Sequence, residues 1–131
     1  MMIHEELTDR IIGAFYKVYN ELGFGFLENV YQNALYIELT NEGFSVEAQK
    51  PIDVYYQNRV VGKYKADLVV NEEIILELKA VDYLVKEHEL QLINYLKATQ
   101  IEIGLLLNFG AKPEIRRKIF TNDRKNPCKS L

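Results

Sequence analysis

The chain has 131 residues, of which 48% are hydrophobic and 27% are charged, and its formal net charge is −3. These values are typical of one globular domain with a sizeable core, and the acidic balance argues against a protein that coats nucleic acid through bulk positive charge. No apolar run approaches the roughly 18 residues that span a bilayer, so we expect no membrane contact. The single cysteine, Cys128, excludes an internal disulfide and a cysteine-based zinc site.

The two ends of the chain carry different charge. The opening "MMIHEELTDR" has acids where a signal peptide needs a basic and then an apolar start, so we expect a cytoplasmic protein. Residues 112–131 carry seven of the 16 basic residues but only two of the 19 acidic ones. We therefore expect a single domain over residues 1–122 and a basic C-terminal tail over residues 123–131, which either contacts phosphates or is only solvated.

Two helices are predicted in the first third of the chain. Apolar residues recur at helical spacing over residues 4–22 and form one stripe, which consists of Leu7, Ile11, Phe15, Val18 and Leu22. Gly23 is a candidate C-terminal cap for this helix. A second helix is predicted over roughly residues 27–41, and Gly43 in "NEG" ends it.

Strands dominate the rest of the chain. "FSVEAQKPIDVYYQ", residues 44–57, has strand composition, and Pro51 within it suggests an edge strand or a bulge. The turns "QNR" and "NEE" lead to strands over residues 59–70 and 73–80. A helix over residues 86–99 precedes "IEIGLLLNFG", whose apolar run is expected of a strand buried on both faces. "RRKIF", residues 116–120, is a candidate final edge strand, so the sequence predicts an α/β fold.

Charged residues occur inside two of these strands, in "KADLVVNEEIILELKA", residues 65–80. Because strand side chains alternate between faces, one face of the hairpin is expected to be apolar. That face consists of Tyr64, Ala66, Leu68 and Val70 on one strand and Ile74, Leu76 and Leu78 on the other. Asp67, Glu77 and Lys79 would then share the opposite face.

The pairing register of this hairpin follows from the same pattern. Directly opposed residues of antiparallel strands point to the same face, so burying Leu68 with Leu76 requires opposed residue numbers with an even sum. A sum of 144 opposes Leu68 to Leu76 and Asp67 to Glu77, with Glu72 at the centre of the turn. A two-residue turn at Asn71 and Glu72 would mix the faces, so we expect an odd-length or bulged turn.

Opposed carboxylates repel each other, and a hard divalent cation removes the repulsion. Mg²⁺ takes oxygen ligands, and two carboxylates, a backbone carbonyl and waters suit it. Such a cation lowers the pKa of a water that it binds, which makes the water a better nucleophile at neutral pH. Lys79 would reach a water or a phosphate oxygen at the same place. The alternative is an exposed polar face with ion pairs.

The spacing of Asp67, nine intervening residues and then "ELK" resembles the signature of the PD-(D/E)XK nuclease superfamily. "GFLENVY", from Gly25 to Tyr31, resembles the G-x-x-E-x-x-Y motif of the GxxExxY family, a branch of that superfamily. "ELKAVDYLVKEHELQLINYLKAT" and "GLLLNFG" resemble downstream blocks of the same branch. The resemblance covers residues 4–120, and its one departure is Ala66, where the superfamily has a proline.

The resemblance implies a restriction-endonuclease-like fold with a bound cation. Its core is a mixed sheet with three antiparallel strands, a crossover helix and a fourth strand, flanked by helices. Mg²⁺ or Mn²⁺ would be held by Asp67, Glu77 and the backbone carbonyl of Leu78, and Glu28 would complete or support that shell. Lys79 would position the attacking water and stabilise charge on the phosphate. For Glu28 the alternative is an acid that only favours its helix N-terminus.

Four further residues are candidates, by their position, for contact with the attacking water or the substrate. Gln91 and Tyr95 are four residues apart and share a helix face, and in related nucleases a Gln on this helix touches the attacking water or the phosphate. Tyr31 is either a core residue or a phosphate contact. His88 could approach the same cleft, or it could be a surface or packing residue.

The leading hypothesis is a metal-dependent nuclease that hydrolyses phosphodiester bonds in DNA or RNA. The first alternative is a catalytically silent module that keeps the fold and binds nucleic acid or another partner. A weaker one is a hydrolase of another phosphate ester. The sequence leaves open the type of nucleic acid, the number of cations and whether the protein is a homo-oligomer.

Overall fold

A computed structural model describes residues 4–125, so Cys128 and most of the predicted basic tail lie outside the described residues. The described residues form three α-helices, five strands and a short 3-10 helix, in an order that begins with two helices, as the sequence predicts. The helices are α1 (Glu5–Leu22), α2 (Glu28–Asn41) and α3 (Lys86–Lys97). The strands are β1 (Val46–Tyr56), β2 (Arg59–Val70), β3 (Ile74–Lys79), β4 (Ile103–Phe109) and β5 (Pro113–Ile119), and η1 (Asn122–Arg124) follows. The predicted α/β class is confirmed.

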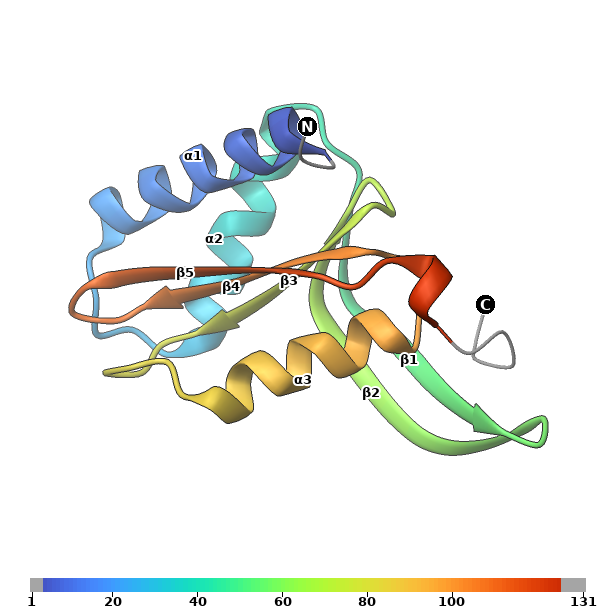
Figure 1. The fold of residues 1–131 in the computed structure, drawn as a ribbon. Coiled ribbons are helices and arrows are strands. Elements are labelled where there is room, and N and C mark those ends of the chain that lie inside the picture. Colours follow the sequence, from blue (N-terminus) through green and yellow to red (C-terminus); the bar gives the residue numbers. More distant parts are fainter. Residues whose placement is uncertain (1–3, 126–131) are drawn as a thin grey trace.

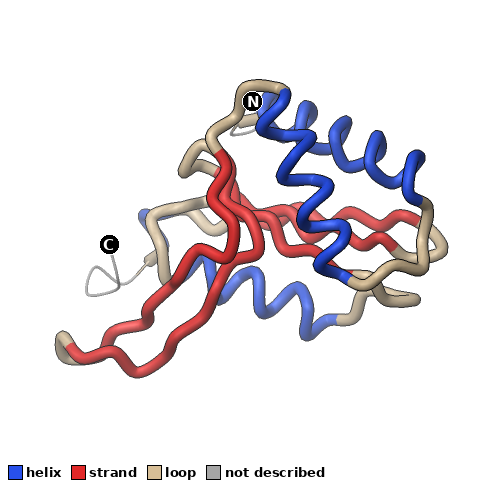
Figure 2. Tube along the Cα trace, turned by 180° about the vertical axis from the view of Figure 1, so that it is seen from behind, coloured by secondary structure: helices blue, strands red, loops and turns tan. Residues whose placement is uncertain are grey.

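The five strands form one mixed sheet in the order β1-β2-β3-β4-β5. Neighbouring strands are antiparallel except β3 and β4, which are parallel and are joined by α3 as a crossover. β1, which contains Pro51, is an edge strand, because an edge tolerates the missing N–H of proline. Figures 1 and 2 show α1 and α2 on one side of the sheet and α3 on the other. None of the helices within residues 4–125 is long and apolar enough to cross a membrane.

Each face of the sheet has its own core. Beneath α1 and α2 lie the even-numbered side chains of β3, which are Ile74, Leu76 and Leu78, with Phe15, Tyr31 and Phe109. Beneath α3 lie Ile75, Val69 and Leu106, with Leu92 and Leu96. All seven residues of β4 are buried, because helices cover that strand on both faces.

The β2–β3 hairpin has the predicted register. Leu68 lies opposite Leu76 and Val70 opposite Ile74, so opposed residue numbers sum to 144. Three residues, 71–73, form the turn, and Asn71 and Glu72 both adopt positive φ, of 53° and 57°. The odd-length turn that the facing pattern required is therefore present.

The prediction that Ala66 and Leu68 share one apolar face of β2 is wrong. Ala66 and Leu68 are two residues apart in β2, yet Ala66 packs beneath α3 whereas Leu68 packs beneath α1 and α2. The β1–β2 pairing skips Gln49 and Asp67, and Gln49 has a φ of 53°. This left-handed residue breaks the alternation of side chains. As a result, even-numbered residues of the inner half of the hairpin, such as Leu68, face α1 and α2, whereas those of the outer half, such as Ile52, face α3. The outer half, residues 51–65, extends beyond the body of the sheet and is called the arm below (Figures 1 and 2).

Candidate active site

The carboxylates of Asp67 and Glu77 lie where β2 and β3 stop pairing. The β2–β3 pairing ends at Leu68 and Leu76, and beyond it each carboxylate accepts a hydrogen bond from the other strand. The backbone N–H of Asp67 donates to Glu77 Oε1 at 3.0 Å. The backbone N–H of Leu78 donates to Asp67 Oδ2 at 2.9 Å. The two acids are thus near neighbours across the hairpin, as the register predicted.

Glu77 is an acid in an unfavourable environment, since only 4% of the residue is exposed. Burial, followed by the charge of Asp67, raises the pKa of Glu77 to about 8. The hydrogen bond from the backbone of Asp67 and the charge of Lys79 oppose this shift without cancelling it. The structure therefore favours a protonated Glu77 near neutral pH, and a nearby cation would favour the ionised form.

Lys79 extends the same face of β3. Leu76 and Leu78 pack beneath α1 and α2, so Glu77 and Lys79 alternate to the side of α3. Lys79 lies beside Asn108 in the parallel β3–β4 pair. The structure thus brings Asp67, Glu77 and Lys79 to one region of the sheet.

Asn108 holds the chain immediately after Lys79, a role that the sequence analysis missed. Its buried amide accepts a hydrogen bond from the N–H of Val81 at 3.0 Å and donates one to the carbonyl of Val81 at 2.9 Å. It also donates to Glu114 Oε1 at 2.9 Å. Gly110 belongs to the same contact, because a Cβ there would lie 2.3 Å from the carbonyl oxygen of Val81. The one available signal was a polar side chain within "GLLLNFG".

Glu28 approaches from the other side of the sheet, in the first turn of α2. Its pKa is raised by burial first; the charge of Lys79 lowers it and the charge of Asp67 raises it. These two influences place Glu28 within electrostatic reach of both residues. Leu27, which precedes α2, offers no side-chain cap, so an anion near the helix N-terminus has backbone N–H groups to meet.

Gln49 is a second residue that the sequence analysis missed. Its Nε2 donates to Gln32 Oε1 of α2 at 2.8 Å and to Asp67 Oδ1 at 3.4 Å. The left-handed backbone that breaks the alternation of β1 therefore also directs this side chain toward Asp67. No local sequence pattern indicates this conformation.

Gln91 and Tyr95 lie on α3, and Tyr95 is within electrostatic reach of the two carboxylates. Burial, then the charges of Glu77 and Asp67, raise the pKa of Tyr95 to about 12, and a side-chain hydrogen bond with Gln91 acts in the opposite direction. His88, in contrast, accepts a hydrogen bond at Nδ1 from the backbone N–H of Val85 at 3.2 Å. That bond closes the first turn of α3, so one ring nitrogen of His88 has a structural partner.

Tyr31 lies in the core, which is the first of the two alternatives that the sequence left open. It is fully buried and stacks on Phe109 with the ring centroids 4.3 Å apart. Its hydroxyl donates to the carbonyl of Gly23 at 2.6 Å and accepts from the N–H of Phe26 at 3.2 Å. Both bonds fix the loop that leads into α2, so Tyr31 supports the position of Glu28.

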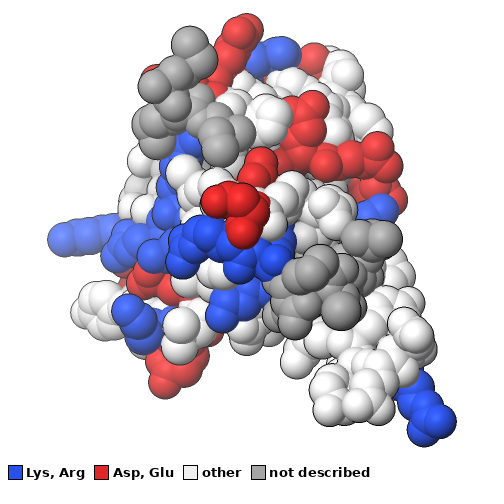
Figure 3. Space-filling model, turned by 45° about the vertical axis from the view of Figure 1, so that its right-hand side comes forward, with Lys and Arg blue, Asp and Glu red and all other residues white. Residues whose placement is uncertain are grey.

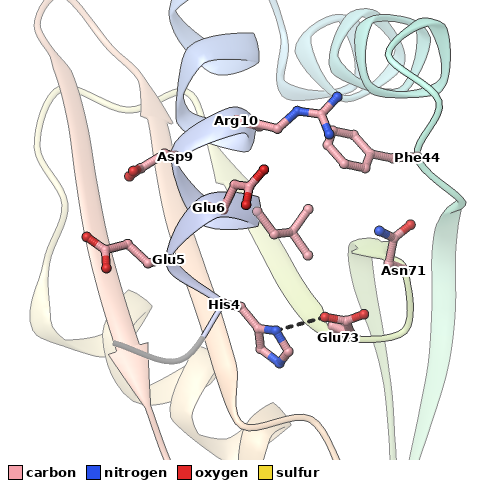
Figure 4. Close-up of a pocket in the computed structure, with 9 residues that line it drawn as sticks. His4, Glu5, Glu6, Asp9, Arg10, Phe44, Asn71 and Glu73 are labelled. Carbon is pink, nitrogen blue, oxygen red and sulfur yellow. Dashed lines mark ion pairs between the residues drawn. The ribbon is translucent and has the colours of Figure 1, made fainter. Parts of the chain in front are cut away.

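Both α2 and α3 begin near the end of β3 that carries Lys79 (Figures 1 and 2). The N-terminus of a helix carries a partial positive charge, so two such ends near one site favour an anion such as a phosphate. A wide surface hollow lies elsewhere, between the N-terminus of α1 and the β2–β3 turn (Figure 4). His4 pairs with Glu73 there at 2.8 Å, and none of the candidate site residues lines it.

Comparison with known proteins identifies the class to which this fold and site belong. A family model described as the PD-(D/E)XK nuclease superfamily matches residues 5–118. Because the match spans most of the chain, the chain belongs to the PD-(D/E)XK nuclease superfamily. Neither a search of curated proteins nor a search of solved structures found a match.

Proposed function

We propose that the protein is a metal-dependent nuclease that hydrolyses phosphodiester bonds in nucleic acid. One observation carries the proposal: the carboxylates of Asp67 and Glu77 meet across β2 and β3, with Lys79 on the same side of β3. A buried acid this close to a second carboxylate is costly unless it serves a purpose such as binding a cation. Membership of the superfamily supports a nuclease-like role.

The donor atoms suit a hard cation. Within residues 4–125, no group of three or more His, Cys, Asp and Glu side chains is arranged to hold a metal ion. In this proposal a cation would take Asp67, Glu77 and the carbonyl of Leu78 from the chain, and water or substrate would supply its other ligands. Oxygen ligands of this kind fit Mg²⁺ or Mn²⁺. The bound ion would neutralise charge on the phosphate and lower the pKa of a coordinated water.

The remaining residues have roles of their own in this proposal. Lys79 positions the attacking water and stabilises the charge that develops on the phosphate. Gln91, which lies against Tyr95, contributes a further hydrogen bond to the water or the phosphate. Glu28 supports the cation from α2, directly or through water. The partly positive helix N-termini of α2 and α3 attract the phosphate backbone.

Three finer assignments belong to the same proposal. The "GFLENVY" motif supports membership of the GxxExxY branch, because Glu28 lies near the site and Tyr31 supports the loop before it. Residues 1–122 would form the catalytic domain, and the protein would act in the cytoplasm.

Incubation of the purified protein with Mg²⁺ or Mn²⁺ and labelled DNA and RNA, single- and double-stranded, tests the proposal. We expect metal-dependent cleavage of at least one substrate by the wild type, and its loss in Asp67→Asn. Glu72→Gln is the matched control, since Glu72 is an exposed acid in the β2–β3 turn. Absence of cleavage by the wild type on every substrate contradicts the proposal.

One observation favours the alternative of a silent binding module. The carboxylates of Asp67 and Glu77 accept backbone hydrogen bonds where the sheet stops pairing, so they also have a structural role. A silent module would bind nucleic acid without cleaving it and would show no heat of Mg²⁺ binding. Calorimetric titration of the wild type with Mg²⁺ separates the two, because only the nuclease needs both carboxylates to bind the ion.

A further inference from the structure

The arm, residues 51–65, exposes several large side chains on a two-stranded ribbon. Tyr56 is 65% exposed, Val61 63% and Tyr64 44%. Single exposed apolar residues are ordinary, but a group of them on one projecting element indicates a surface that meets a partner.

The charge of the arm differs from that of the rest of the protein. The arm contains three basic residues and one acid, Asp53, so its formal charge is +2, whereas that of the whole chain is −3. The basic residues are Arg59, Lys63 and Lys65. Lys63 lies 3.9 Å from Asp53, which is opposite it across the ribbon. The arm is therefore a cationic and aromatic element on an acidic protein, and a polyanion with planar groups is its complement.

The arm is continuous with the candidate active site. β2 runs from Lys65 to Asp67 without interruption, and the ring of Tyr64 packs against the ring of Tyr95 with centroids 5.6 Å apart. Tyr95 in turn lies close enough to the carboxylates of Asp67 and Glu77 for their charges to raise its pKa.

One face of the arm forms a track toward that site. Ile52 lies opposite Tyr64, and Tyr56, four residues after Ile52 on the same strand, lies opposite Arg59. Tyr56 shares the face of Ile52 by alternation along β1, and pairing across a bulge between Val54 and Tyr55 brings Arg59 to the same face as Tyr64. Lys63 and Lys65 add positive potential from the other face. The order along the track is Tyr56 with Arg59, then Tyr64, then Tyr95.

We propose that the arm holds single-stranded nucleic acid and leads it to the carboxylates. Bases stack on Tyr56 and Tyr64, and Arg59 contacts the phosphate backbone between them. A single strand is favoured over a duplex because only unpaired, unstacked bases offer their faces to an aromatic side chain. The inference rests on the proposed nuclease function for its substrate class, but the binding itself requires no cleavage.

Fluorescence anisotropy tests the arm directly. It measures the affinity of the protein for a labelled single-stranded oligonucleotide and for its duplex, with EDTA present to prevent cleavage. We expect the single strand to bind more tightly than the duplex. Tyr56→Ala and Tyr64→Ala should each weaken single-strand binding by about 5- to 150-fold, the range for loss of one base–aromatic stack. Tyr56→Phe and Tyr64→Phe should keep most of the affinity because they keep the ring. Arg59→Gln should reduce the salt dependence of single-strand binding: the slope of log affinity against log salt concentration should become smaller by roughly 0.7.

Tyr36→Ala is the matched control, because Tyr36 is also partly exposed, at 38%, but lies on α2. Circular dichroism of each variant checks folding, and the Phe variants keep the test valid if an Ala variant unfolds. Unchanged affinity in Tyr56→Ala, or tighter binding of the duplex, overturns the inference. So does a dimer that Tyr56→Ala converts to monomer with its nucleic-acid affinity unchanged, since the arm would then bind a second copy of the chain.

The arm and the active site can fail separately. If the wild type cleaves nucleic acid but the arm variants keep its affinity and KM, the arm proposal is wrong and the nuclease stands. If the wild type cleaves nothing but single-strand binding depends on Tyr56 and Tyr64, the arm proposal stands and the nuclease does not.

Discussion

Glu77 shows the conflict between stability and function at the scale of one residue. Its carboxylate is buried and close to Asp67, so the metal-free protein favours the protonated form and pays an electrostatic cost to ionise it. An apolar residue would pack at this position without that cost. The acid is therefore better explained by a ligand that stabilises its charge than by the fold alone.

The first prediction concerns the pH dependence of metal-free stability. The pKa of Glu77 rises from an ordinary value of 4.5 to about 8 on folding. The folded protein therefore binds the extra proton between these values, and the free energy of unfolding should fall as the pH rises from 4.5 through 8. The loss of unfolding free energy should be on the order of a few kcal/mol. It should be complete once the pH exceeds the pKa of Glu77 in the folded protein. Urea unfolding in EDTA across this pH range measures it.

Glu77→Gln should flatten that pH profile, because the amide does not titrate and its oxygen can still accept the Asp67 N–H. Glu72→Gln, in the exposed turn, should leave the profile as in the wild type. A wild-type profile that stays level from pH 5 to pH 8, or one that Glu77→Gln does not alter, contradicts the assignment of the raised pKa to Glu77.

The second prediction concerns Lys79, whose role differs most between enzyme and binding module. In the nuclease, Lys79→Ala should reduce turnover by at least about 10²-fold, because it removes a group that stabilises developing charge. Lys79→Arg should restore activity only in part, since a planar guanidinium does not replace a compact ammonium. Metal stabilisation should survive in both variants. In the silent module, Lys79→Ala would instead weaken binding modestly and Arg would substitute well.

The predictability of the site varies from residue to residue for physical reasons. Asp67 and Glu77 could be placed near each other because the odd-length turn sets the register of the hairpin, and alternation along β3 puts Lys79 on the face of Glu77. Gln49 and Asn108 could not be found, because one depends on a left-handed backbone and the other on the close approach of Val81. Both act through contacts between residues far apart in the sequence.

At the scale of elements, a glycine in β4 makes room for a side chain of α3. A Cβ at Gly104 in β4 would lie 2.5 Å from Cδ1 of Leu92, which is the residue after Gln91. Glycine at this position therefore sets how near α3, with Gln91 and Tyr95, lies to the carboxylates. Most helix and strand boundaries were predictable from periodicity and turn residues, although β5 begins at Pro113 and not at residue 116 as predicted. The helix-to-sheet distance was not predictable.

The third prediction follows from that packing. Gly104→Ala should destabilise the protein by about 1–3 kcal/mol, because Leu92 must move to admit the methyl group. Activity should fall as well, since α3 carries Gln91 and Tyr95 outward. Gly13→Ala is the matched control: Gly13 lies within α1 with no atom within 4 Å of an added Cβ. It should stabilise the helix by roughly 0.5–1 kcal/mol. Equal effects of the two substitutions on melting temperature would contradict the packing argument.

The change of face in the β1–β2 hairpin is the element-scale feature that the sequence did not indicate. Alternation predicted one continuous apolar face from Tyr64 to Val70, whereas the break at Gln49 and Asp67 divides it. The same break separates the arm from the inner half of the hairpin. Asp67, at the break, contacts Gln49 of β1 on one side and Glu77 and Leu78 of β3 on the other. An irregularity at a strand centre is frequently found beside a functional site, because it redirects a side chain.

At the scale of the whole molecule, charge is distributed unevenly. Figure 3 shows Lys and Arg side chains gathered in a band on one face, with acidic side chains beside them. Three basic residues of the C-terminal region, Arg116, Arg117 and Lys118, lie in β5. Lys118 pairs with Glu89 of α3, and Arg116 with Glu114 at 3.4 Å. Charged side chains on an edge strand also oppose pairing with another sheet, so this basic region has a structural role besides any contact with phosphate.

The last prediction joins the site to the stability of the whole domain. Both cores pack on one sheet, so the domain should unfold in a single transition. A cation that binds only the folded state stabilises it by about 2.7 kcal/mol at 100 times its Kd, which raises the melting temperature by several degrees. Mg²⁺ should produce this rise in the wild type, more strongly at pH 9 than at pH 6 because Glu77 must ionise to bind it.

Differential scanning calorimetry with and without Mg²⁺ measures the effect. Asp67→Asn should lose the response, Lys79→Ala should keep it, and Glu72→Gln should match the wild type. Ca²⁺ or Mn²⁺ in place of Mg²⁺ shows whether the response depends on the ion. A wild-type melting temperature that does not change in millimolar Mg²⁺ at pH 9, above the pKa of Glu77, would show that the pair does not hold the ion, and the function would then have to be sought in binding alone.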